Sequence, residues 1–162
     1  MHDVAIQDRL RDNFCWGCGA DNPDGLHLKS YWDGRVAVAT FVPADMFAAG
    51  PRHVLNGGIV ATLLDCHGVC TAIAQAYDAE ARTIGSDPEI WRATTSMEVT
   101  YLRPTPLGQE LALSGRVLGA AAAPGRRGVT SVECVLSCGG KERARATVRS
   151  VRVSEEWRHG LR

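Results

Sequence analysis

The chain has 162 residues, which suits one domain of ordinary size that buries about two-thirds of the surface its unfolded chain exposes. Its 18 Lys and Arg residues balance its 18 Asp and Glu residues, so its charge does not predict binding to nucleic acid or to an anionic membrane. The first residues are charged and lack the apolar core of an export signal, so we expect a cytoplasmic protein whose six cysteines are reduced.

The first half of the chain predicts two strands followed by one long helix. An N-terminal lead-in, residues 1–14, is expected to be mobile or helical, and the next eleven residues are rich in Gly, Asn, Asp and Pro, which indicates a loop. Asp33-Gly34 between two strand-like runs is typical of a hairpin turn. The helix is apolar on nearly every side, so we expect surrounding structure to bury it. The strands are predicted at 26–32 and 35–42, and the helix at 57–77.

The second half alternates between apolar and polar residues in four runs, which predicts four strands. These runs cover 94–102, 110–118, 129–137 and 143–153. Strands on both sides of a single apolar helix favour an α+β fold, with an antiparallel sheet wrapped around that helix. The expected domain covers residues 15–155, with a tail at 156–162. Because such a sheet leaves an edge or a face open, we expect pairing with a second copy of the chain.

The cysteines fall into three pairs, of which only the first has a spacing that favours a metal. Cys15-Trp-Gly-Cys18 is half of a zinc-ribbon pattern, but no second half follows it in the sequence. The pairs 66/70 and 134/138 are predicted to be small buried side chains. A redox site would need a strand, then Cys-x-x-Cys, then a helix, and this context is missing. The sequence therefore predicts no metal and no cofactor.

The start of the helix combines features of a catalytic site. Gly57-Gly58 lets a ligand approach the free N–H groups of the first turn, and Asn56 before it is suited to cap the helix. Asp65, two turns later, is a carboxylate within an apolar helix: it is either a general base whose pKa burial raises, or a structural residue hydrogen-bonded to a neighbouring strand or subunit. His67 faces nearly the opposite way and is predicted to be a satisfied buried histidine.

Three segments resemble those of a known family. Residues 56–65 resemble a His-Gly-Gly motif followed, after six residues, by Asp. Residues 15–26 resemble an N-terminal Cys-x-x-Cys-Gly run with later Asn-Pro and Gly-Leu, and residues 101–104 resemble the Tyr-Leu-Arg-Pro end of the strand after the helix. In this order and spacing, they are similar to the hot-dog fold thioesterases, relatives of the 4-hydroxybenzoyl-CoA and phenylacetyl-CoA thioesterases.

The resemblance implies a hot-dog fold, assembled as a homodimer or homotetramer with its active site at a subunit interface. It implies hydrolysis of an acyl-CoA thioester, in which Asp65 either activates water or attacks the thioester itself. The backbone amides of Gly57 and Gly58 would bind the oxyanion, and Thr94 would reach in from the partner subunit near the water. Candidates for contacts to the substrate or to the CoA phosphates are His53, Thr95, Arg103, Arg126 and Arg127.

One departure from the family pattern leaves alternatives open. Asn56 occupies the position of the usual histidine, and it can donate a hydrogen bond but cannot carry a proton. Catalysis would then depend on Asp65, and a non-catalytic acyl-CoA-binding protein remains the alternative. A dehydratase would need a histidine paired with an acid, which the helix does not offer on one face. A small zinc or redox module is the remaining alternative.

Overall fold

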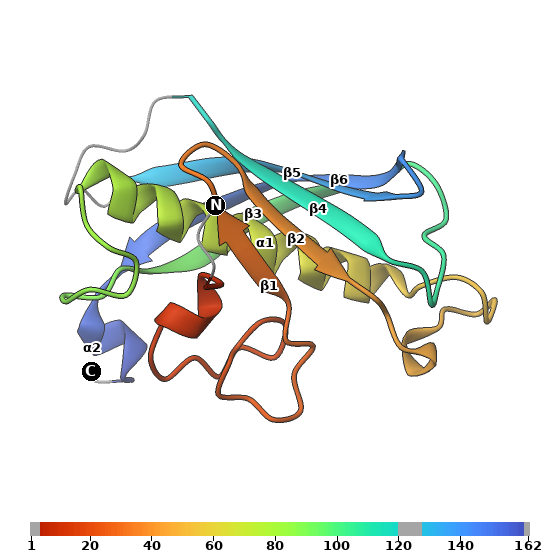
Figure 1. Cartoon of the computed structure of the whole chain (residues 1–162), viewed down its shortest axis with the longest axis horizontal. Helices are drawn as coiled ribbons and strands as arrows, with labels where there is room; N and C mark the ends of the chain where they lie inside the picture. The colour runs from red at the N-terminus through yellow and green to blue at the C-terminus, as the bar shows by residue number, and fades with distance from the viewer. Residues whose placement is uncertain (1–3, 120–127, 161–162) are drawn as a thin grey trace.

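One antiparallel sheet curls around one long helix in the computed structural model, which describes residues 4–119 and 128–160 (Figure 1). The six strands lie in the order β1-β2-β4-β5-β6-β3, so β1 and β3 form the two edges. This confirms the predicted α+β architecture and element order. The strands are β1 (Lys29–Trp32), β2 (Ala37–Phe41), β3 (Trp91–Tyr101), β4 (Leu111–Leu118), β5 (Val129–Cys138) and β6 (Lys141–Val153). The helices are α1 (Gly57–Ala79), the short α2 (Glu155–Arg158), and the 3-10 turns η1 (Gln7–Arg9) and η2 (Asp45–Phe47).

The alternation of β6 shows why the sheet forms where the sequence predicts it. Ala144, Ala146 and Val148 are buried against α1, while the residues between them are more exposed, because successive side chains of a strand point to opposite faces. The expected strand at 94–102 begins earlier, at Trp91, because Trp91 pairs with Val153 at the end of β6. The other predicted boundaries differ from the observed ones by three residues or fewer at each end.

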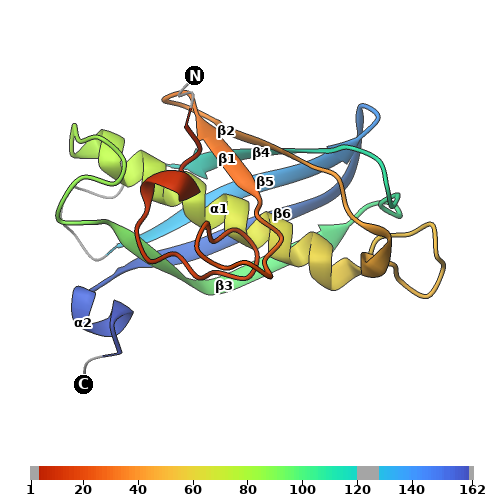
Figure 2. The same cartoon turned by 60° about the horizontal axis from the view of Figure 1, so that its bottom comes forward.

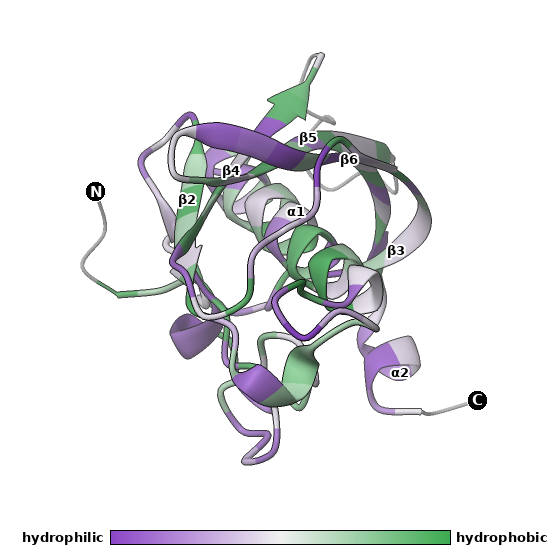
Figure 3. Cartoon of the chain, turned by 90° about the vertical axis from the view of Figure 1, so that its right-hand side faces the viewer, coloured by the Kyte–Doolittle hydropathy of each residue, from purple (hydrophilic) through white to green (hydrophobic). Residues whose placement is uncertain are grey.

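Helix α1 fills the concave side of the sheet, as the view along its axis shows (Figure 3). It contacts all six strands. The approach is closest at Gly68, where a Cβ would lie 2.7 Å from Val148 Cγ2, so a larger residue would push the helix off the sheet. Length and composition alone would let α1 cross a membrane, but 61% of its most apolar window is buried within this fold. The prediction of a core helix is therefore confirmed.

His67 is a structural residue of this core, as predicted. Its ring is completely buried, with Nδ1 2.9 Å from Ser30 Oγ and Nε2 3.2 Å from the Ala37 carbonyl oxygen. Burial lowers the pKa of His67 to about 4, so the ring is neutral at physiological pH. Both ring nitrogens contact strands β1 and β2, and His67 therefore ties α1 to the sheet.

The N-terminal segment covers the side of α1 that the sheet leaves open (Figure 2). Residues 4–14 pack into the domain: Ile6 and Leu10 are buried, and the Ile6 N–H donates to the Ser30 carbonyl of β1. At the other end, Arg158 of α2 donates to Glu89 at 2.5 Å and lies 4.4 Å from the centre of the Trp91 ring. Leu10 and Asn13 of the N-terminal segment line the cavity described next, and Arg158 packs against Trp91, which also lines it.

Candidate active site

Asp65 lies two turns into α1, in the wall of a cavity between the helix, β3 and the N-terminal loop. Its Oδ1 accepts a hydrogen bond of 2.7 Å from the Thr94 hydroxyl, which stands on the edge strand β3. The cavity has a volume of about 180 Å³ and has both apolar and polar walls. The apolar walls come from Leu10, Val69, Ile73 and Trp91. The carboxylate therefore faces a small pocket and is held there by one hydroxyl.

The surroundings of Asp65 suit a proton acceptor. Burial raises the pKa of Asp65 above its ordinary value, because the charged form loses hydration. The hydrogen bond from Thr94 opposes this by stabilising the carboxylate, and the nearby Cys18 raises the pKa further. A carboxylate that is costly to keep charged, yet oriented by a hydroxyl, is able to take a proton from water.

Thr94 was expected to approach from the partner subunit, but the structure places it beside Asp65 of its own chain. The reason is the path of β3, which pairs with β6 along its inner edge and passes over the middle of α1. A β-bulge lies between Thr94 and Ser96, which pair with the consecutive residues Ser150 and Arg149 of β6 and leave Thr95 without a partner in the ladder. Thr95, within the bulge, donates to the Arg149 carbonyl at 3.1 Å and does not line the cavity.

The start of α1 forms a second polar feature. Asn56 is the N-cap, as predicted, and its Oδ1 accepts from the Gly58 N–H at 2.8 Å, an interaction worth about 1 kcal/mol. Of the two predicted oxyanion donors, the Gly58 amide is therefore already engaged, whereas the Gly57 amide is the first N–H of the helix and has no acceptor within it. The Tyr101 hydroxyl donates to the Gly57 carbonyl at 2.8 Å. Tyr101 belongs to a recognised motif, but sequence reasoning gave it no role.

The helix start and Asp65 are too far apart to act on one thioester within one chain. Eight residues separate Gly57 from Asp65, and at 1.5 Å per residue this is about 12 Å along the axis of α1. An oxyanion donor must lie about 3 Å from the oxygen of the carbon under attack. One chain therefore contains two parts of a site but does not bring them together.

The remaining predicted contact residues are dispersed. His53 lies exposed in the loop before α1, where its carbonyl accepts from the Leu107 N–H at 3.0 Å. Arg103 is exposed, donates to the Glu142 carbonyl at 2.9 Å, and lines an open groove that also includes Gly57. Arg126 and Arg127 lie outside the described residues. No histidine is found among the described residues that line the cavity at Asp65, which argues against the dehydratase alternative.

Arg92 is a cavity residue that the sequence did not reveal. Its guanidinium is buried and donates to Ser150 Oγ, Thr130 Oγ1 and the Ser150 carbonyl, all of them neutral acceptors. Burial and the positive charge of Arg152 lower its pKa to about 10, so Arg92 stays charged at neutral pH. Alternation on β3 is the signal that could have identified an inward position here, although arginine is rarely buried.

Four cysteines also line this cavity: Cys15, Cys18, Cys66 and Cys70. The sequence separated them into two unrelated pairs, and the fold brings the pairs together. The neighbouring thiols, that of Cys15 first, lower the pKa of Cys18, because they stabilise its thiolate form. The third predicted pair behaves as expected, since Cys134 and Cys138 are buried in the sheet.

Solved structures with this fold include several thioesterases. A thioesterase superfamily protein from Shewanella loihica PV-4 is 31% identical, with a TM-score of 0.56 over 78% of this chain and 91% of that one. A phenylacetic acid degradation-related protein from Ralstonia eutropha JMP134 is 22% identical, with a TM-score of 0.59 over 78% and 85%. A hypothetical thioesterase protein with coenzyme A from Streptococcus pneumoniae TIGR4 is 15% identical, with a TM-score of 0.61 over 78% and 86%. No protein-family profile and no curated protein matches the chain.

Proposed function

Because this chain belongs to the thioesterase superfamily, with the hot-dog fold, we propose that it hydrolyses an acyl-CoA thioester to the free acid and CoA. The observation that carries this proposal is Asp65, which lines a cavity, accepts a hydrogen bond from Thr94, and has a pKa that burial raises. Coenzyme A in the Streptococcus pneumoniae structure supports the choice of CoA as the carrier.

In this proposal Asp65 either takes a proton from the attacking water or attacks the thioester carbon itself. Thr94 orients the carboxylate by donating a hydrogen bond to its Oδ1. Attack on the carbonyl moves negative charge onto its oxygen, and the collapse of the intermediate expels the CoA thiolate. Attack by water yields the free acid directly, whereas attack by Asp65 leaves an anhydride that a water molecule then hydrolyses to the free acid and the Asp65 carboxylate. Free N–H donors aimed at that oxygen lower the barrier, since they stabilise the charge only as it develops.

The oxyanion donors would come from a second copy of the chain, since the separation of about 12 Å along α1 excludes those of the same copy. The Gly57 amide is the first donor. The Asn56 side-chain amide is the second, because only its oxygen is used by the N-cap bond. A homodimer thus completes two equivalent sites, each with Asp65 from one copy and the helix start from the other.

The edge strand β3 offers a way to build this dimer. It has 11 residues, and among the described residues no strand pairs with its outer side, so a second β3 can add to the sheet. Along β3, Thr94 lies beside Asp65 and Tyr101 lies beside Gly57, since each is hydrogen-bonded to that residue of α1. Antiparallel pairing about a two-fold axis between Met97 and Glu98 would place Thr94 opposite Tyr101 of the second copy. The same axis would bring Asp65 across from the second copy's helix start.

The two ends of the substrate would occupy different features. The groove at Gly57 is open to solvent and includes Arg103, whose guanidinium would bind a CoA phosphate in this proposal. The acyl group would enter the cavity at Asp65, whose volume of about 180 Å³ is well below the roughly 300–1,000 Å³ of drug-sized pockets. We therefore expect a short or single-ring aryl acyl group.

A free-thiol release assay over a panel of acyl-CoAs tests this function. We expect release from acetyl-, butyryl-, benzoyl- and phenylacetyl-CoA at a higher kcat/KM than from palmitoyl-CoA, because the long chain exceeds the cavity. Absence of release from every member by folded protein would refute hydrolysis. Tight binding of the same acyl-CoAs in that case, measured by calorimetry, would establish the acyl-CoA-binding alternative.

Removing the Thr94 hydroxyl should shift the pH dependence of the reaction. In Thr94→Val the hydrogen bond that lowers the pKa of Asp65 is lost, so the pKa rises and the acidic limb of kcat/KM moves to higher pH. The measurement is kcat/KM against pH with one acyl-CoA. Thr94→Ser keeps the hydroxyl and should retain the parental profile, while an unshifted limb in Thr94→Val would show that Thr94 does not control Asp65.

A further inference from the structure

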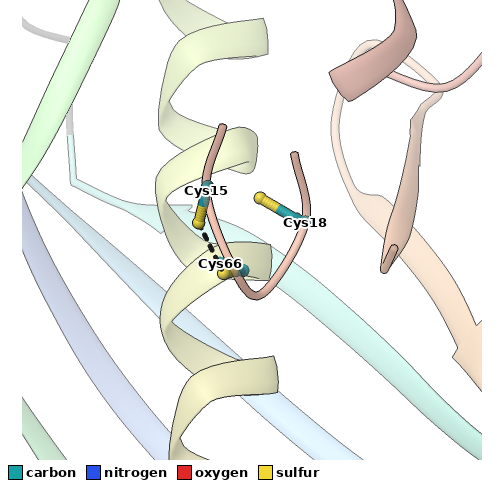
Figure 4. A group of neighbouring side chains, drawn as sticks. All are labelled: Cys15, Cys18 and Cys66. Carbon is teal, nitrogen blue, oxygen red and sulfur yellow. Dashed lines mark hydrogen bonds between the residues drawn. The ribbon is translucent and has the colours of Figure 1, made fainter. Parts of the chain in front are cut away.

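Thiols from two distant segments meet beneath α1. The ligand atoms of Cys15, Cys18 and Cys66 all lie within 4.8 Å of one another, and Figure 4 shows the two loop sulfurs directed toward the helix. Cys70, one turn further along the same face of α1, lines the same cavity as these three cysteines. The two pairs therefore form one cluster, with Cys-x-x-Cys from the loop and Cys-x-x-x-Cys from the helix.

The loop is shaped to bring its sulfurs to the helix. Gly19 donates its N–H to the Cys15 carbonyl at 2.7 Å, which closes a tight turn around the first pair. A Cβ on Gly17 would overlap Cys66 Sγ and would lie 2.8 Å from Thr62 Cγ2, so only glycine lets the loop approach this closely. Two further backbone bonds, from Leu26 to Trp16 and from Leu28 to Gly17, hold the returning chain beside this turn.

The sulfur spacing fits a tetrahedral metal ion. Zinc binds thiolate sulfur at about 2.3 Å, which places two sulfurs of a tetrahedron about 3.8 Å apart. Cys15 and Cys66 Sγ are 3.7 Å apart in the structure. Structural zinc sites use pairs of cysteines separated by two to four residues, and both pairs of this cluster satisfy that spacing. Thiolate ligands favour zinc over the hard cations magnesium and calcium.

Apolar packing alone does not account for this arrangement. Cys134 and Cys138 show how a cysteine packs as a small apolar residue here: both are buried in the sheet, and neither belongs to a metal-like group among the described residues. In the cluster, by contrast, the sulfurs themselves converge, and Cys15 is exposed at the outer side. An ion therefore has a way into the site from solvent.

We propose that Cys15, Cys18 and Cys66, with Cys70 as the fourth ligand, bind one zinc ion that fixes the N-terminal loop onto α1 beside Asp65. The ion would stabilise the wall of the cavity, since all four cysteines line it. A site with four protein ligands has no open position, so its role is structural and the thioester chemistry stays with Asp65. This inference does not depend on the proposed hydrolysis.

Metal analysis of the whole chain, produced without a metal-binding tag and dialysed against metal-free buffer, tests the site directly. We expect one zinc ion per chain, and loss of that zinc in Cys66→Ser. Cys134→Ser is the matched control, because it removes an equally buried thiol outside the cluster and should keep the zinc. Asp65→Asn should also keep it, which separates this test from the catalytic one.

Cobalt provides a second readout that does not depend on how well a variant folds. Parent protein stripped of zinc and loaded with Co²⁺ should show thiolate-to-cobalt charge-transfer absorption and the visible bands of a tetrahedral site, and zinc should displace them. Zinc removal should also lower the Tm. The proposal would be overturned by protein that, after zinc has been supplied, holds less than half an equivalent of zinc per chain. This applies whether the four cysteines of the cluster are then free thiols or Cys15 and Cys18 form a disulfide.

Discussion

Asp65→Asn is expected to lower kcat/KM for acyl-CoA hydrolysis by a factor on the order of 10²–10⁴, the usual contribution of a positioned general base. The asparagine amide has the shape of the carboxylate and still accepts from Thr94, but it cannot take a proton or attack a thioester. If Asp65 is the nucleophile, the loss should exceed this range. Thiol release under saturating and limiting substrate measures both kcat and KM.

The same substitution should leave the fold intact. Burial raises the pKa of Asp65, which means that the charged form is costly here, and a neutral side chain of the same size removes that cost. We therefore expect a Tm equal to or above that of the parent. Asp78→Asn is the matched control: Asp78 lies on α1 as well, accepts from Trp32 Nε1 at 2.6 Å, and is remote from the cavity. Asp65→Asn protein with more than a tenth of the parental kcat/KM would exclude Asp65 from the chemistry.

The sequence predicted the fold well because local patterns determine it. Alternation marks the buried face of β6, and an apolar run with Asn56 and Gly57 at its start marks the beginning of α1. Both patterns depend on neighbours within one element. Residues 4–14 show the limit, since Ile6 and Leu10 are buried through contacts with distant segments, and their spacing alone does not show this.

The site was predictable only in part, because its chemistry depends on contacts across the fold. Asp65 could be identified as a candidate from the sequence, because a carboxylate within an apolar helix is costly unless it is paired or used in catalysis. The Gly58 N–H, a predicted oxyanion donor, instead donates to the side chain of Asn56. The sequence motif alone does not reveal this detail of the capping geometry. Forty-seven residues lie between Cys18 and Cys66 in the sequence. No spacing rule predicts that a cysteine in a loop and a cysteine in a helix this far apart will meet. The path of β3 likewise determines that Thr94 meets Asp65 of its own chain.

A mixed dimer should recover activity that neither parent variant has, if each site draws on two copies. Gly57→Pro removes the proposed oxyanion N–H, which should cost about 10²–10³ in kcat. Proline suits this position, because Gly57 is the first residue of α1 and Asn56 before it has φ −57° and ψ 132°, which a residue preceding proline adopts. Gly57→Ala keeps the N–H and should remain active, as its Cβ would meet Tyr101 no closer than 3.5 Å.

Two differently tagged chains, one Asp65→Asn and the other Gly57→Pro, can be co-expressed and the mixed dimer isolated through both tags. One site of that dimer combines an intact Asp65 with an intact Gly57, while the other has lost both, so we expect about half of the parental kcat. If the donors and Asp65 acted within one chain, each site would lack one of them and the mixed dimer would be as inactive as its parents. The length of α1 makes the first result the expected one, because about 12 Å of helix separates the two groups in a single copy.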